Sequence, residues 1–248
     1  MTTTIKLTEM TWKMVAEALA NGYNTVIVSV GSIEQHGYHL PLSTDEHLGD
    51  CLALILAEKL GNALVAPTIR PGCSSHHLPF PGTISVRPET LIEYLKDVCT
   101  SLDHHGFDNI VLIPSHGGNF APVQTAVQSI AGELGANLIA LADLNALITS
   151  FKEAIKETGQ PESSAGGHAG SGEISFMLYY KPELVYQEYM KPGYIGPLTG
   201  KYVREGFDSV TPTGVLGDPT KASSEAGEIA IEMITDSMVE MIKRELAN

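Results

Sequence analysis

Apolar runs of strand length alternate with helix-like patterns along much of the chain. The apolar, β-branched runs predict strands, at residues 24–32, 63–69, 109–115 and 137–143. Amphipathic spacing and helix-stop signals predict helices, at residues 11–21, 45–60, 88–104, 121–134 and 223–245. Because the strands contain few polar positions, both faces of their sheet should be buried. The order therefore predicts an α/β fold, with a parallel sheet flanked by helices on both faces.

The region between residues 144 and 222 fits this alternation less well. Residues 159–172 are rich in glycine and serine. Such a segment is either a flexible linker or a site loop that needs unusual backbone angles. Residues 191–219 are rich in proline, glycine and tyrosine. The chain shows no internal repeat, and its 248 residues are predicted to form one domain, 1–248.

Composition removes several classes of protein. The 15 Lys and Arg residues oppose 29 Asp and Glu residues, giving a formal net charge of −14, which disfavours nucleic acid or an anionic membrane as a partner. No apolar run reaches the roughly 18 residues of a membrane span, and the N-terminal residues lack an apolar signal core. The three cysteines form neither a disulfide framework nor a Cys-x-x-Cys zinc motif. We therefore expect a cytoplasmic protein.

Residues able to bind metal ions follow the predicted strands. Glu34 and His36 are two positions apart after the first strand, so in an extended segment they point to the same side. Asp45 can bridge two ions, and His116 and Glu173 would complete the set. Nitrogen and oxygen donors without thiolates suit Zn²⁺, Mn²⁺ or Fe²⁺. Taken singly, each residue is equally explained by a surface loop, a helix cap or a core histidine, so the prediction depends on all five meeting at one sheet edge.

The remaining candidate motifs are less specific. Residues 76–83 (HHLPFPGT) either line a pocket or form a rigid proline turn. His104 and His105 lie at a predicted helix end, where a cation is favourable. Cys73 lacks the arrangement expected of a thiol nucleophile. The chain contains no GxSxG, GxGxxG or P-loop motif.

Five segments occur in the order of the motifs of a known hydrolase family. They are residues 31–45 (GSIEQHGYHLPLSTD), 79–83 (PFPGT), 115–119 (SHGGN), 168–175 (HAGSGEIS) and 214–219 (GVLGDP). These segments resemble the motifs of the creatininase (creatinine amidohydrolase) family, over about residues 8–230. Residues 116–119 read HGGN where true creatininases have HYEN, and Leu144 stands where one of their gating tryptophans would fall. The chain is therefore similar to the wider HGGN-type branch of the family rather than to a true creatininase.

The resemblance implies a three-layer creatininase-like fold and a hydrolytic site with two divalent ions, of zinc, manganese or iron. It assigns five metal ligands, with Asp45 bridging the two ions, and makes His168 the proton-transfer residue. The ligands are Glu34, His36, Asp45, His116 and Glu173. The resemblance also implies a homo-oligomer, commonly a hexamer. We further expect four residues to contact the substrate, namely Tyr38, His39, His77 and Asn119.

The predicted activity is hydrolysis of a small, cyclic amide or a related carbonyl compound. A hydroxide shared by the two ions would attack the carbonyl group, and His168 would carry the proton. Four alternatives stay open at this stage. They are ring opening of a cyclic keto-polyol by carbon–carbon cleavage, a metal-dependent lyase or isomerase reaction, a peptidase-like activity, and non-catalytic binding.

Overall fold

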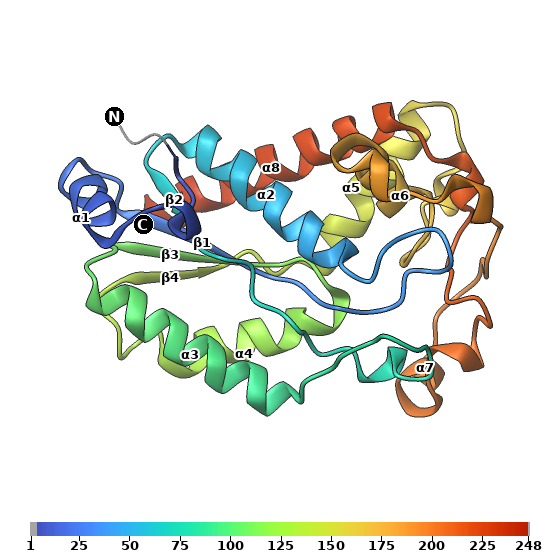
Figure 1. Cartoon of the computed structure of the whole chain (residues 1–248), viewed down its shortest axis with the longest axis horizontal. Coiled ribbons are helices and arrows are strands. Elements are labelled where there is room, and N and C mark those ends of the chain that lie inside the picture. Colours follow the sequence, from blue (N-terminus) through green and yellow to red (C-terminus); the bar gives the residue numbers. More distant parts are fainter. Residues whose placement is uncertain (1–3, 248) are drawn as a thin grey trace.

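Three layers of secondary structure make up the part of the chain described by the computed structural model, residues 4–247 (Figure 1). The middle layer is a parallel sheet in the order β2-β1-β3-β4. Helices α2, α5, α6 and α8 lie above the sheet in Figure 1, whereas α3 and α4 lie below it. The strands are β1 (Thr25–Val30), β2 (Ala63–Val65), β3 (Asn109–Pro114) and β4 (Asn137–Ala140). The predicted fold class is confirmed.

The helices alternate with these strands as far as β4 and then follow one another. They are α1 (Trp12–Ala20), α2 (Thr44–Leu60), α3 (Pro88–His104), α4 (Phe120–Ile130), α5 (Leu144–Glu157), α6 (Ser171–Tyr180), α7 (Lys201–Glu205) and α8 (Ser224–Leu246). Helix α3 begins at the predicted Arg87-Pro88 step, where proline occupies the first turn and loses no hydrogen bond.

Alternate residues of each central strand face opposite layers. Ile27 of β1 and Val111 of β3 pack in the core cluster that contains α2 and α8. Their neighbours Val28 and Leu112 pack in the cluster that contains α3 and α4. Since successive side chains of a strand point to opposite faces, a sheet covered on both sides needs apolar residues at every position. This explains the lack of polar alternation in the sequence.

The register of β1 and β3 positions the loops that follow them. The two strands pair from Thr25 with Asn109 to Val30 with Pro114. Both strands therefore end at the same level, and the chain segments after Val30 and Pro114 leave the sheet side by side.

Strand β4 ends at Ala140, before the predicted position 143, and the short helix α7 was not predicted. Two further boundaries and two further helices also differ from the sequence expectation. Strand β2 is shorter than predicted because Pro67 interrupts it, although Ile69 still donates a backbone hydrogen bond to Ser29. Helix α4 ends at Ile130, before the predicted position 134. Helices α5 and α6 were not predicted. Helix α5 starts at an N-cap, Asp143, whose side chain accepts a hydrogen bond from the backbone N–H of Ala146.

The glycine-rich segment connects α5 and α6, and its second part, from residue 164 on, is largely buried. Ala165 and His168 within it are both buried. Gly166 has a φ of +67°, and a Cβ atom there would collide with the carbonyl oxygen of Leu216. Only glycine fits such a position without strain. This packing favours the site-loop interpretation of the segment over the flexible linker.

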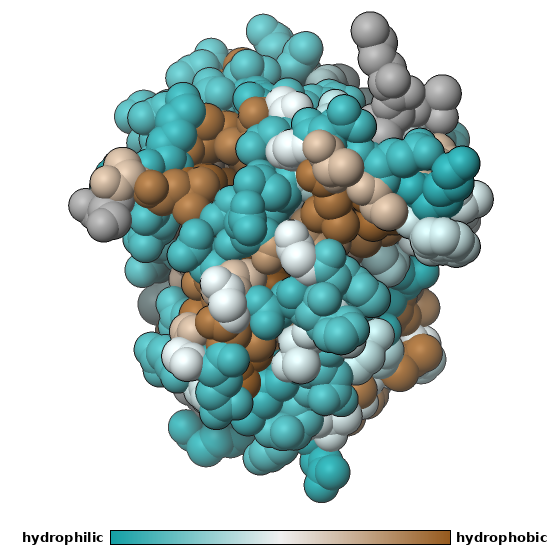
Figure 2. All heavy atoms as spheres, turned by 90° about the vertical axis from the view of Figure 1, so that its left-hand side faces the viewer, coloured by the Kyte–Doolittle hydropathy of each residue, from teal (hydrophilic) through white to brown (hydrophobic). Residues whose placement is uncertain are grey.

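The described helices include none that is long and apolar enough to cross a membrane. Figure 2 shows the end of the molecule on the left of Figure 1, beyond the N-terminal ends of the strands. Hydrophobic side chains form separate patches there, divided by hydrophilic ones. The candidate site lies at the opposite, carboxyl edge of the sheet.

Candidate metal centre

The loops that leave the carboxyl edge of the sheet carry the polar side chains predicted for the site. Glu34 and His36 follow β1 and are both fully buried. His116 follows β3 and is 4% exposed. Because β1 and β3 pair along their whole length, residues about eighty positions apart in the chain lie next to each other.

Two helix N-termini supply the remaining carboxylates. Asp45 lies in the first turn of α2 and Glu173 in the first turn of α6. Negative side chains are favourable at the positive end of a helix. The first residue after β1 is Gly31, where a Cβ atom would come within 3.0 Å of the Asp45 carbonyl oxygen. The missing side chain therefore lets the start of α2, and Asp45 with it, approach the β1 loop closely.

Asp45 lies between two histidines. Its Oδ1 is 3.4 Å from His36 Nε2, and its Oδ2 is 3.3 Å from His116 Nδ1. Glu34 Oε2 lies 3.2 Å from His116 Nδ1, and Glu173 Oε2 lies 3.6 Å from His36 Nε2. Two groups of ligand atoms contain Asp45, Glu34 with Asp45 and His116, and His36 with Asp45 and Glu173, and in each the atoms lie within 4.8 Å of one another. Glu34, His36 and His168 form a third group of the same kind. The structure thus brings the five predicted ligand residues together, with Asp45 common to the first two groups.

Backbone carbonyl groups determine which nitrogen of each histidine faces the cluster. Nδ1–H of His36 donates to the Glu34 carbonyl oxygen at 3.2 Å. Nε2–H of His116 donates to the Cys73 carbonyl oxygen at 3.1 Å. The other ring nitrogen, His36 Nε2 or His116 Nδ1, then has a lone pair directed at the carboxylates. Proteins orient metal-binding histidines in this way.

Three buried atoms of the cluster have no hydrogen-bond partner among the described residues. They are Glu34 Oε1, His36 Nε2 and Asp45 Oδ2. Leaving a buried polar atom without a partner costs roughly 1–3 kcal/mol. Divalent cations would satisfy all three atoms. The donor set of carboxylate oxygens and imidazole nitrogens fits Zn²⁺, Mn²⁺ or Fe²⁺.

The electrostatics of the cluster also favour positive charge. Burial alone would lower the pKa of His36, but the carboxylates of Asp45 and Glu173 outweigh burial and raise this pKa to about 10. Burial alone would also lower the pKa of His116. The carboxylates of Glu34 and Asp45 outweigh burial and raise this pKa well above its usual value. Without metal, the carboxylates would therefore hold protons on these two rings in place of the cations.

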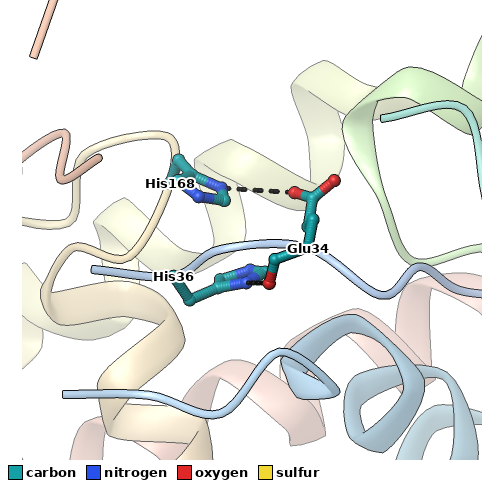
Figure 3. Close-up of side chains that lie close together, drawn as sticks. All are labelled: Glu34, His36 and His168. Carbon is teal, nitrogen blue, oxygen red and sulfur yellow. Dashed lines mark hydrogen bonds and ion pairs between the residues drawn. The ribbon is translucent and has the colours of Figure 1, made fainter. Parts of the chain in front are cut away.

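Two further histidines lie on the Glu34 side of the cluster. His77 Nε2 is 3.2 Å and His168 Nδ1 is 3.7 Å from Glu34 Oε1. Figure 3 shows the His168 ring facing the Glu34 carboxylate, with His36 close to Glu34 on the same segment. Burial lowers the pKa of His168 well below its usual value, and His36 and His77 add to this shift. Burial also lowers the pKa of His77, so both rings are neutral near pH 7.

Gln35 contacts both rings, His77 through its side-chain amide and His168 through its backbone carbonyl group, although no motif in the sequence assigns it a role. Gln35 Oε1 accepts a hydrogen bond from the Gly37 backbone N–H at 3.0 Å, which orients the amide. Gln35 Nε2 then donates to His77 Nδ1 at 2.8 Å. His168 Nε2 lies 2.7 Å from the Gln35 carbonyl oxygen, so this nitrogen carries the proton. Consequently His77 presents an N–H to the cluster, whereas His168 presents a lone pair.

A cavity of about 720 Å³ opens onto the cluster. Six of the predicted site residues line it, Glu34, Asp45, His77, His116, His168 and Glu173.

The other three residues expected to bind substrate do not line this cavity. Tyr38 is 64% exposed. His39 is buried, and its Nε2 lies 3.0 Å from the Ala169 carbonyl oxygen. The Asn119 side chain accepts from the Cys73 N–H and donates to two carbonyl groups at the end of β1. His39 and Asn119 therefore hold the surrounding loops together, and a role for them in substrate binding stays a prediction.

Comparison with known proteins decides the family. The family model described as creatininase, creatinine amidohydrolase, matches residues 8–242. The chain belongs to the creatininase family. It is accordingly a metal-dependent hydrolase of that family, as the motifs predicted.

Several characterised creatininase-family proteins are similar to the chain. A mycofactocin precursor peptide peptidase from Mycobacterium ulcerans is 31% identical over 91% of this chain and 87% of its own length. A 3-dehydro-scyllo-inosose hydrolase from Thermotoga maritima is 29% identical over 94% of this chain and 81% of its own. A crystal structure of creatinine amidohydrolase has a TM-score of 0.81 at 28% identity, over 98% of both chains. A zinc–zinc form of a mutant creatininase also has a TM-score of 0.81, at 26% identity over 98% of this chain and 99% of its own.

Gly118 marks the branch of the family to which the chain is similar. A Cβ atom at this position would collide with the Cys73 carbonyl oxygen and lie 2.6 Å from His116 Nε2. The loop is therefore packed around glycine, and a glutamate like that of HYEN does not fit at this backbone position.

Proposed function

We propose that this protein hydrolyses an amide or a related carbonyl compound with two divalent metal ions, which the five clustered residues would hold. Glu34, Asp45 and His116 would bind one ion, and His36, Asp45 and Glu173 the other. The observation that carries the proposal is the shared position of Asp45, with one carboxylate oxygen facing each histidine. The zinc–zinc and manganese forms of similar creatininases support these metals.

Two divalent ions at such a site acidify a water molecule and polarise a carbonyl group. The residues of this chain would orient the substrate and move its protons. In the hydrolysis, the water oxygen bonds to the carbonyl carbon, the carbon–nitrogen bond breaks, and the nitrogen leaves with a proton.

His168 is suited to carrying that proton. Its Nε2–H is held by the Gln35 carbonyl oxygen, so the Nδ1 lone pair faces the cluster. Because the buried ring is neutral near pH 7, Nδ1 can accept a proton from water and return it to the departing nitrogen.

His77 is suited to donating a hydrogen bond. Since Gln35 donates to His77 Nδ1, the Nε2–H of His77 is directed at Glu34 and the cavity. A fixed N–H beside the reacting carbonyl would stabilise negative charge as it develops on oxygen.

Elemental analysis combined with an alanine variant tests this proposal. The purified protein should contain close to two metal ions per chain. His168→Ala should keep the metal but lower turnover by about 10²–10⁴-fold. His104→Ala, at the solvent-exposed end of α3, is the control and should leave both unchanged. Full activity of metal-stripped protein would contradict the proposal.

Ring opening of a cyclic keto-polyol is a second candidate reaction, favoured by the similarity to the inosose hydrolase. Product analysis in ¹⁸O-labelled water, with a panel of cyclic amides, formamides and keto-polyols, separates the candidates. Amide and ring-opening hydrolysis both place label in the new carboxylate but yield different products. A lyase or isomerase reaction incorporates no label into a carboxylate.

The predicted homo-oligomer, a hexamer by family resemblance, stays a prediction. Light scattering of the purified protein would measure its mass in solution.

A further inference from the structure

The wall of the cavity that lies away from the metal-ligand cluster is largely apolar. Its apolar side chains come from separate segments: the turn after β2, the approach to α3, the start of α5, and α7 with the loop before it. They are Leu78, Val86, Leu144, Ile148, Leu198 and Val203. Leu78, Leu198 and Val203 are 56%, 44% and 64% exposed. Exposed apolar side chains that converge on one cavity are typical of a ligand-binding surface.

A single permanently positive side chain, Arg87, lines the same cavity. No hydrogen bond or ion pair joins its guanidinium group to any residue in the described range 4–247. The neighbouring acidic residue, Glu89, does not line the cavity.

The position of Arg87 is unfavourable for a cation. Arg87 is the N-cap residue of α3, a helix of 17 residues, and its side chain makes no capping hydrogen bond. Residues with a side-chain acceptor are preferred at this position, and the positive end of the helix disfavours a nearby cation. The Arg87 side chain therefore does not cap the helix. Together with the helix end, however, it creates positive charge at the cavity wall, in a chain whose net charge is −14.

We propose that the cavity binds an open-chain amide whose departing amine carries both an apolar side chain and a carboxylate, that is, an N-acylated apolar amino acid. The inference rests on the proposed amide hydrolysis and names its substrate class. The amide carbonyl would lie at the cluster, the apolar side chain between α5 and the 198–203 segment, and the carboxylate at Arg87. Such a peptide-like substrate differs from the small cyclic amide expected from the sequence.

The size and lining of the cavity separate this class from the alternatives. A single small ring would fill only a small part of about 720 Å³. A keto-polyol has hydroxyl groups on every side, and the apolar wall would leave many of them without hydrogen bonds, which is costly. An N-acyl amino acid matches the polar floor, the apolar wall and the positive charge at the same time.

The reaction balances as a simple hydrolysis. The water oxygen adds to the acyl carbon, the carbon–nitrogen bond breaks, and the products are a carboxylate and the free amino acid. His168 transfers the proton from the water to the departing nitrogen, and no oxidant or further reactant is needed.

Three probe compounds test the substrate class on the metal-loaded protein: N-acetyl-L-leucine, N-acetyl-L-leucinamide and N-acetylglycine. The acid should exceed its carboxamide in kcat/KM on the order of tenfold, as expected for a hydrogen bond to a charged group. It should exceed N-acetylglycine by a similar factor, since the leucine side chain is buried on binding. Calorimetry on metal-free protein should show the same order of affinities, which separates binding from catalysis.

Paired variants assign these preferences to residues. Arg87→Gln should remove the preference for the acid over the carboxamide, whereas Arg204→Gln, an exposed arginine of α7 that does not line the cavity, should keep it. Leu198→Asn should remove the preference for leucine over glycine. Ile195→Asn, an exposed apolar residue of the same loop outside the cavity, should not.

Several outcomes would overturn the inference. One is an equal kcat/KM for the acid and its carboxamide. Another is a loss of the preference for the acid in Arg204→Gln as large as that in Arg87→Gln. A third is a change of oligomeric state in Leu198→Asn while the preference for leucine over glycine is kept. The last result would assign the apolar wall to an interface between copies of the chain. If none of the probes binds to a protein that takes up two metal ions, the substrate class is wrong but the metal site stands. If the protein takes up no metal, the proposed function itself fails.

Discussion

At the scale of single residues, Asp45 has the largest influence on the proposed site. Its two carboxylate oxygens face different histidines, Oδ1 toward His36 and Oδ2 toward His116. Both groups that contain Asp45 therefore lose a member if this one side chain is shortened, whereas Glu34, His36, His116 and Glu173 each belong to only one of these two groups.

Asp45→Ala should consequently remove both metal ions rather than one. Metal content measured by elemental analysis should fall to background, and activity should fall by at least 10²–10³-fold. Glu46→Gln is a close control, because Glu46 is the next residue along but pairs with Arg70 at 2.8 Å outside the cluster. Retention of one tightly bound ion in Asp45→Ala would contradict a bridging role.

Gln35 is expected to act on the site by fixing the tautomer of His77, because its amide donates a hydrogen bond to His77 Nδ1. Gln35→Ala should leave the metal content unchanged but lower kcat by roughly 10–100-fold, as for other residues that orient a site. The histidine rings report the cause directly. Nitrogen NMR shifts should show a single tautomer for His77 in the wild type and a mixture in the variant. An unchanged tautomer with reduced kcat would mean that Gln35 acts in another way.

The sequence predicted which carboxylates and histidines cluster better than it predicted the residues around them. Glu34 and His36 belong to a residue-type pattern that metal chemistry makes recognisable. Gln35, placed between them, became significant only through its side-chain contact with His77 and its carbonyl contact with His168, which are 42 and 133 positions away. Such contacts leave no local pattern in the chain.

At the scale of elements, the short turn after β3 is tightly constrained. Gly118→Ala would push a Cβ atom against the Cys73 carbonyl oxygen, the same oxygen that accepts the hydrogen bond of His116. The substitution should therefore weaken metal binding about 10–100-fold and lower stability by roughly 1–3 kcal/mol. Metal titration and thermal unfolding would measure the two effects.

Gly117→Ala is the matched control for this substitution. A Cβ atom at Gly117 would have nothing within 4 Å, so metal affinity and melting temperature should stay close to those of the wild type. Equal effects of the two substitutions would show that the turn needs glycine for flexibility and not for space.

The elements missed by the sequence patterns have physical reasons. Helix α6 is buried on several sides, with Ile174, Phe176 and Met177 fully enclosed. A helix buried all round shows no amphipathic period, and its apolar run is as typical of a strand. Helix α5 has an N-cap at Asp143, but the sequence prediction placed this residue at the end of the strand 137–143, so the start of the helix was not recognised.

At the scale of the whole molecule, metal binding should be coupled to stability. The proposed ligands come from the loops after β1 and β3 and from the first turns of α2 and α6, so the site exists only in the folded chain. A ligand that binds only the native state, at about a thousand times its dissociation constant, stabilises it by roughly 4 kcal/mol. For a chain of this length, that corresponds to an increase in melting temperature of roughly 10 °C.

Differential scanning calorimetry with and without a chelator would measure this shift. The wild type should melt at lower temperature after metal removal, and added Mn²⁺ or Zn²⁺ should restore the original value. Asp45→Ala should melt at one temperature regardless of metal. A wild-type melting temperature that does not respond to the chelator would argue against a bound metal in the native state.

The overall architecture was largely predictable because it depends on repetition. Four apolar runs, separated by three helices, allow few arrangements other than a covered parallel sheet. The second half, in which α5, α6 and α8 pack on the same face, lacks this repetition. The arrangement of these helices depends on which of their surfaces pack together. Hydrophobic periodicity predicts the helices but not these packing partners.

The positions of the ligands along the chain have a consequence for synthesis. Glu34, Asp45 and His116 all emerge from the ribosome before the second group, which waits for Glu173. A nascent chain that has folded β1, α2 and β3 would offer one complete set of three ligands, and the other only after more than fifty further residues. The two cations would then be captured in a fixed order, and the first could act as a template on which the late helix docks.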